Sequence, residues 1–168
     1  MILVTGGTGV IGSEVLRLLS QAGVPARALV RNPQKAQKLP GITWVVGDLA
    51  RPETLTTAFE DAKTVFLLTH YFEDMVELQH NAIAAARAAG VTHVVKVSAF
   101  AASDHSNAPI GRWHYQVEKE LQDSGMGWTM LRPHHFMLNL LAQAEYVKQG
   151  VMYSPSGDGK IPYIDPRD

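Results

Sequence analysis

The sequence predicts an α/β fold in which helices cover both faces of a doubly wound parallel sheet. Short apolar segments typical of strands alternate with segments of helical periodicity along the chain. This alternation favours a parallel sheet, because parallel strands need long crossover connections. With 168 residues and 46% hydrophobic content the chain can bury one sizeable core, so we expect one main domain.

The first strand-to-helix turn carries the most specific pattern. Gly6 permits a tight turn, Gly9 lets the backbone approach a pyrophosphate, and Gly12 allows close packing of helix and strand. Free amides at a helix N-terminus bind phosphate, so the turn predicts a dinucleotide site. A glycine-rich turn without a ligand gives a similar pattern. The predicted contacts are Gly6, Thr8, Gly9, Val10, Ile11 and Gly12.

The end of the second predicted strand, residues 26–30, decides which dinucleotide is expected. A site for NAD places an acidic residue about 20 positions after the turn, where it binds the ribose 2′-hydroxyl. This chain has Arg31 there, and Lys35 lies one turn further on. A guanidinium binds a 2′-phosphate through paired charge-assisted hydrogen bonds, so the pattern favours NADP(H). The alternative is that both side chains belong to an ordinary solvated surface.

Turn residues and periodicity place the other elements. The first helix is closed by Gly23, a later helix begins at Pro52, and Pro133 stops the last strand because proline cannot donate to a sheet. Further strands are expected at 43–46, 64–68, 93–98 and 128–131, and further helices at about 52–60, 73–89 and 111–123.

Doubly wound sheets bind ligands beyond the carboxyl ends of their strands. After the third strand, the Asp48 carboxylate could accept from an adenine amino group while Leu49 covers the ring, although a Gly-Asp turn without a ligand is equally common. His70 follows the fourth strand and could equally be a solvent-facing loop histidine. The candidate cofactor contacts at these strand ends are Asp48, Leu49, Leu68, Thr69, Ser98 and Pro133.

The motif GGTGVIG at residues 6–12 and the segment RNPQKA at residues 31–36 resemble the extended and atypical short-chain dehydrogenase/reductases. Within them the chain is similar to the NmrA-like group over residues 1–168. That group includes NADPH-dependent quinone oxidoreductases, dye reductases and non-catalytic redox sensors. The resemblance implies that Thr69, His70 and Ser98 lie along the ribose and nicotinamide of the cofactor.

The helix predicted at 111–123 contains Tyr115 and Lys119, which spell the YxxxK motif of a reductase that protonates its substrate through tyrosine. Alignment with the resembled family gives a different register. It is fixed by Glu118, Leu121, Ser124 and Gly125. In this register His114 stands where the family has its catalytic lysine, and Ile110 stands where the family has its tyrosine. Tyr115 then points about 100° away from His114. His114 is the catalytic candidate, and a satisfied structural histidine is the alternative.

The C-terminal region suggests the beginning of a second unit. Residues 1–133 are expected to form the NADP-binding domain, and 134–168 the start of a substrate-binding region that stops short of the family's usual length. Residues 133–141 have the apolar content of a core helix, on which His134 and His135 would diverge. Their place after a strand end would also suit a pocket floor, and residues 154–160 are expected to form a mobile glycine-rich loop. The candidate floor residues are Pro133, His135, Phe136 and Met137.

Composition excludes several classes of function. A net charge of −1 without a basic run gives no footprint for nucleic acid, and the absence of cysteine excludes disulfides and thiolate sites. No apolar stretch reaches the roughly 20 residues of a membrane span, and no metal site is evident. We therefore expect a cytoplasmic protein. The resemblance implies a small-molecule aromatic or quinone substrate, and a homo-oligomer is compatible with the sequence.

Two functions remain open from the sequence. The first is an oxidoreductase that uses NADPH to reduce quinones or related electron-poor aromatic acceptors. Such acceptors delocalise negative charge themselves, so reduction can depend on orientation and exclusion of water. The alternative is a non-catalytic NADP(H)-binding redox sensor that signals through a protein partner. Resemblance of fold alone cannot separate the two.

Overall fold

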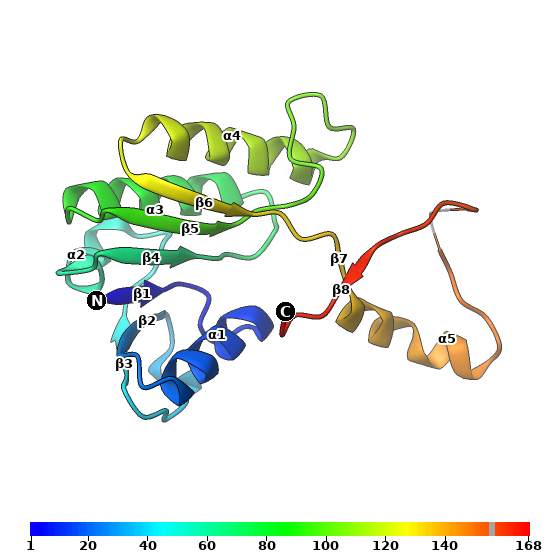
Figure 1. Cartoon of the computed structure of the whole chain (residues 1–168), viewed down its shortest axis with the longest axis horizontal. Coiled ribbons are helices and arrows are strands. Elements are labelled where there is room, and N and C mark those ends of the chain that lie inside the picture. The colour runs from blue at the N-terminus through cyan, green and yellow to red at the C-terminus, as the bar shows by residue number, and fades with distance from the viewer. Residues whose placement is uncertain (155–156) are drawn as a thin grey trace.

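The computed structural model describes residues 1–154 and 157–168, and it contains a six-stranded parallel sheet with helices on both faces (Figure 1). The strand order is β3-β2-β1-β4-β5-β6. The order reverses between β1 and β4, and in doubly wound sheets ligands bind at this switch point. The predicted fold class is confirmed. The strands are β1 (Ile2–Val4), β2 (Ala26–Val30), β3 (Ile42–Val46), β4 (Thr64–Leu67), β5 (His93–Val97) and β6 (Gly127–Leu131).

Alternating side chains of the central strands divide the core into two layers. Leu3 of β1 faces the larger layer, where Phe59 and Leu121 are fully buried. Val4, the next residue, faces the opposite layer and packs with Leu16. The period of two along a strand explains this division. The larger layer is covered by α2 (Thr56–Phe59), α3 (Met75–Ala88) and α4 (Pro109–Asp123), and the smaller one by α1 (Val10–Gln21).

One connection is tighter than the sequence predicts. The helix expected at 52–60 is divided into a 3₁₀ turn, Pro52–Thr54, and the short helix α2. The Thr54 hydroxyl donates to the Arg51 carbonyl at 2.7 Å, which holds the tight turn. Between β2 and β3 the chain forms only a 3₁₀ turn, Pro33–Lys35, capped by the Asn32 side chain. Local side-chain bonds to the backbone thus hold both 3₁₀ turns.

The expectation of an apolar core helix at 133–141 is wrong. The short strand β7 (His135–Phe136) pairs in parallel with β8 (Tyr163–Ile164), and the intervening chain forms a 3₁₀ helix, Met137–Gln143, followed by α5 (Ala144–Lys148). No residue of the 3₁₀ helix is buried, and Leu141 is 67% exposed. A segment with high apolar content forms a core helix only if another surface packs against it, and none of the residues of this 3₁₀ helix is buried in that way. In Figure 1 this segment stands apart from the main sheet.

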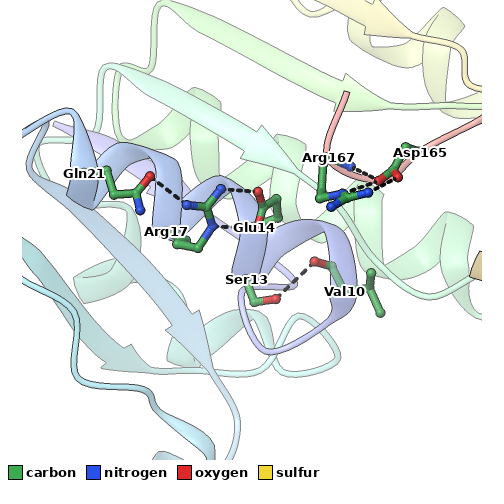
Figure 2. Close-up of polar contacts among 7 residues, drawn as sticks. All are labelled: Val10, Ser13, Glu14, Arg17, Gln21, Asp165 and Arg167. Carbon is green, nitrogen blue, oxygen red and sulfur yellow. Dashed lines mark hydrogen bonds and ion pairs between the residues drawn. The ribbon is translucent and has the colours of Figure 1, made fainter.

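The C-terminal residues return to helix α1. Figure 2 shows Asp165 and Arg167 paired with each other beside α1, with a nitrogen–oxygen distance of 2.6 Å. The pKa of Glu14 on α1 is lowered chiefly by its hydrogen bond with Arg17, and the charge of Arg167 contributes to the same shift. Part of the loop expected at 154–160, namely residues 155–156, lies outside the described residues. Within the described ranges no helix has the length and hydropathy needed to cross a bilayer.

Candidate cofactor site

A cavity of about 450 Å³ lies at the carboxyl ends of β1, β2 and β4, where the order of the strands reverses. Ten of the fourteen predicted cofactor contacts line it. The exceptions are Gly12, Lys35, Ser98 and Pro133. The ten that line the cavity are Gly6, Thr8, Gly9, Val10, Ile11, Arg31, Asp48, Leu49, Leu68 and Thr69.

The glycine turn has the geometry of a phosphate cradle. Gly6 has a φ of +65°, and a Cβ there would lie 2.9 Å from the Leu68 carbonyl oxygen. A Cβ on Gly12 would lie 2.2 Å from the Gly6 carbonyl oxygen, which explains why Gly12 is buried against the turn and does not reach the cavity. Gly9 is exposed and caps α1 without a side-chain bond, so the first amides of the helix can meet an anion.

Arg31 lies at the rim of the cavity, directly after β2. No side chain in the described ranges forms an ion pair or hydrogen bond with its guanidinium. An unpaired guanidinium at this position fits a ribose 2′-phosphate. Lys35 is exposed on the following 3₁₀ turn and does not line the cavity.

Asp48 forms the local turn, which is one of the two roles that the sequence leaves open. The Oδ1 of Asp48 accepts from the Ala50 amide at 3.0 Å, and this bond forms the local turn expected of an aspartate. Asp48 also lines the cavity. Leu49 is buried beside it. The turn is present, and the adenine contact stays a prediction.

A shared hydroxyl joins the two central strands at the switch point. Thr5 Oγ1 donates to the Leu68 carbonyl and accepts from the Leu68 amide, both at 2.8 Å. Beyond Leu68, the Thr69 hydroxyl accepts from Gln79 at 2.8 Å and donates to the His70 carbonyl at 3.0 Å. Thr5, His70 and Tyr71 all line the cavity. Thr5 directly follows β1, and His70 and Tyr71 follow β4, so the position after a strand is the sequence signal that all three share.

A buried polar cluster lies behind the ends of β5 and β6, outside the residues that line the cavity. Ser98 donates its hydroxyl hydrogen to Glu118 at 2.6 Å, and Arg132 donates to the same carboxylate at 2.9 Å and 2.5 Å. Glu118 is 1% exposed. Burial alone would raise the pKa of Glu118, but the hydrogen bonds from Arg132 and Ser98 lower it below its usual range. The carboxylate therefore stays charged.

His114 belongs to the same cluster. Its Nδ1 lies 3.0 Å from Nζ of Lys96, a lysine of β5 that is fully buried and also donates to the Val97 carbonyl at 3.2 Å. Burial lowers the pKa of Lys96 to about 7. Burial and the Lys96 charge lower the pKa of His114 to about 4, so its imidazole is neutral at pH 7. His114 does not line the cavity.

The buried face of helix α4 carries the residues that the alignment with the resembled family places together. His114, Glu118 and Leu121 are all buried on one side, as their spacing of four and three residues implies. Tyr115 is half-buried and Lys119 is exposed, so the apparent YxxxK pair does not share this buried face.

The expectation that His134 and His135 diverge on a helix is wrong. The two residues follow β6 in extended chain, and their Nδ1 atoms lie 2.8 Å apart. Pro133, just before them, accepts from the Phe100 amide at 3.0 Å. Among the described residues no three histidine or carboxylate side chains come together in a way that could hold a metal ion.

The fold and the glycine turn together define a dinucleotide-binding domain. A statistical model of the NAD(P)H-binding family matches residues 6–164, and the chain belongs to that family. The expectation drawn from the sequence motifs is confirmed at this level.

Known relatives agree with this assignment. The chain is 44% identical to the NAD(P)H azoreductase of Xenophilus azovorans over 100% of its own length and 60% of the relative. It is 38% identical to quinone oxidoreductase 2 of Escherichia coli strain K12, covering 96% of this chain and 58% of the relative. The chain therefore spans about three fifths of the length of these relatives.

The crystal structure of an NADPH-dependent quinone oxidoreductase from Escherichia coli, solved with NADPH, superposes with a TM-score of 0.90 at 34% identity. The match covers 99% of this chain and 61% of that structure.

Proposed function

We propose that this protein uses NADPH to reduce quinones or related electron-poor aromatic acceptors by hydride transfer. The observation that carries the proposal is the cavity at the switch point, which combines a glycine phosphate cradle with the guanidinium of Arg31, unpaired among the residues that the structure describes. The similarity to an azoreductase and a quinone oxidoreductase supports the same chemistry. These relatives are longer than this chain, so the activity of the whole protein is part of the proposal.

The residues present fit NADPH. The first amides of α1 would hold the pyrophosphate, Arg31 would bind the 2′-phosphate, and Asp48 with Leu49 would contact the adenine. Thr69, Ser98 and Pro133 lie toward the nicotinamide half, because they follow β4, β5 and β6. When bound, NADPH supplies the hydride. The protein contributes orientation of the two reactants and exclusion of water.

Within this proposal His114 acts as a neutral imidazole. Its pKa of about 4 leaves few imidazolium ions at pH 7, so it does not supply the proton in the way the unperturbed residue would. Through its contact with Lys96, His114 helps to position the buried cluster to which Ser98 belongs. The proton for the reduced acceptor then comes from solvent.

We further propose that residues 1–133 form the cofactor-binding unit and that residues 134–168 begin the surface that covers the acceptor. The separate pairing of β7 with β8, away from the six-stranded sheet, supports this division.

The test is oxidation of NADPH when the full chain is mixed with a panel of quinones and azo dyes. Turnover supports the reductase. The second candidate is a redox sensor, which is favoured by the presence of Ile110 and His114 where related reductases place tyrosine and lysine. Binding of NADP⁺ and NADPH without turnover of any acceptor would support the sensor instead.

A further inference from the structure

An open groove of about 520 Å³ lies next to the cofactor cavity. The segment that joins β4 to α3 forms one side of it, and Trp113 of α4 forms the other. Tyr71 lines both the groove and the cofactor cavity, so the two spaces adjoin at this residue. The residues of this acceptor groove are Tyr71, Phe72, Glu73, Asp74 and Trp113.

Aromatic rings dominate the walls of the acceptor groove. Tyr71 is 66% exposed and Phe72 is 63% exposed, although large apolar side chains usually lie buried. Their ring centroids lie 5.2 Å apart, and the Phe72 ring lies at the same distance from His70, which lines the cofactor cavity. Exposed clusters of this kind mark binding sites, and flat rings stack on flat ligands.

The charges in the acceptor groove have one sign. Glu73 and Asp74 supply two carboxylates, and none of the described residues that line the groove is a lysine or an arginine. Asp74 lies 3.5 Å from Nδ1 of His70, which carries a charge only when protonated. Glu73 has no partner among the described residues. A groove lined by charge of one sign attracts ligands of the opposite sign and repels ligands of its own.

We propose that the acceptor groove binds the substrate, and that it takes planar aromatic acceptors that are neutral or cationic and discriminates against sulfonated or carboxylated ones. The inference rests on the proposed reductase function, whose acceptor it specifies. The reaction balances as quinone, NADPH and one proton giving hydroquinone and NADP⁺. Two electrons leave the cofactor with the hydride, and the solvent supplies the proton.

The experiment compares three naphthoquinones with the same ring system on the full chain: an unsubstituted one, one with a quaternary ammonium group, and one with a sulfonate. We expect kcat/KM to be lowest for the sulfonate. Trp113→Ala should raise KM about tenfold for all three while the Kd of NADPH stays unchanged, because a stacking wall is lost. Glu73→Gln should raise kcat/KM of the sulfonate severalfold and lower that of the ammonium compound.

Two matched variants control for general effects. Trp128→Ala removes an exposed tryptophan at the start of β6, and Glu60→Gln removes an exposed carboxylate at the end of α2. Neither should change the KM or the charge preference. An unchanged KM in Trp113→Ala, or a charge preference that survives Glu73→Gln, would show that the acceptor binds elsewhere.

A separate measurement distinguishes this inference from the proposed function. If none of the tested acceptors supports oxidation of NADPH by the wild type, the proposed reductase function fails. Binding of the three naphthoquinones is then measured by calorimetry in the presence of NADP⁺. Binding that follows the same charge order and is lost in Trp113→Ala would support the groove. Binding that Trp113→Ala leaves intact would overturn it.

Discussion

Arg31 is the residue on which the choice between the two dinucleotides depends. Arg31→Asp removes a charge-assisted contact and adds repulsion, so it should weaken binding of NADPH by on the order of 2 to 4 kcal/mol and reverse the preference over NADH. Titration of both cofactors checks this. Lys35→Asp is the control, and its effect should be smaller because Lys35 does not line the cavity. Equal titration curves for NADPH and NADH in the wild type would contradict the prediction.

Tyr115 and His114 test the register of α4. We expect Tyr115→Phe to leave reductase activity within a few-fold of the wild type, because Tyr115 lies off the buried face of the helix. His114→Ala should lower it further, since Lys96 then loses its buried partner. A true general acid contributes roughly 10² to 10⁴ in rate. Steady-state kinetics decide, and a collapse of turnover in Tyr115→Phe with unchanged NADPH affinity would mean that the YxxxK motif is functional.

Lys96 makes the stability of the protein depend on pH. Its folded pKa of about 7 lies below the value of about 10.4 for an unfolded lysine, so above pH 7 the unfolded chain binds the extra proton. The free energy of unfolding should therefore rise between about pH 7 and pH 10. Lys96→Met should remove this rise and stabilise the protein most at the low end of the window. Urea denaturation at several pH values measures it, with the exposed Lys119→Met as the control.

The residues found from the sequence are those whose signals are local. Arg31 and the glycines are defined by their distance from a strand, and the structure places most of them around one cavity. The burial and the partners of Lys96 and Ser98 could not be predicted from such local signals. Their partners, His114 and Glu118, lie 18 and 20 positions away on another element, so their burial and pKa values depend on packing.

The β1–α1 unit gives a prediction at the scale of an element. Gly9→Val places a branched side chain at the exposed N-terminus of α1, where a phosphate must approach, so cofactor binding should vanish while the fold survives. Gly12→Val should instead destabilise the protein strongly, since even its Cβ would overlap the Gly6 backbone. Calorimetric titration and thermal unfolding of both variants separate the roles. Native affinity in Gly9→Val would place the phosphate site elsewhere.

Elements with clear boundary residues were predicted well. The helix expected at about 73–89 is α3, which is followed by Gly90 with a φ of +71°. The helix expected at about 111–123 is α4, which begins two residues earlier than predicted, with Pro109 in its first turn. Residues 133–141 were predicted wrongly because hydrophobic content shows that a segment can be buried and not which surface would bury it. Strand β7 is instead set by pairing with Tyr163–Ile164, far along the chain, which no local pattern reveals.

For the whole molecule, alternation of strands and helices was enough to predict a doubly wound sheet. The sheet order then fixes the site, since the central reversal between β1 and β4 brings together residues that are far apart in the sequence. The acceptor groove was not foreseen. It depends on how the β4–α3 segment lies against Trp113 of α4, which is a matter of tertiary packing.

The bond between Ser98 and Glu118 has a consequence for ligand polarity. A hydroxyl carries a single hydrogen, and at Ser98 the carboxylate has already taken it. Toward a bound molecule this oxygen presents only lone pairs. Whatever lies against it must bring its own proton, as an amide N–H or a ribose O–H does, whereas the carbonyl oxygen of a quinone would meet an acceptor facing an acceptor. In the proposed complex, where Ser98 lies toward the nicotinamide half of the cofactor, we therefore expect its oxygen to meet a ribose O–H or an amide N–H and not the carbonyl oxygen of the acceptor.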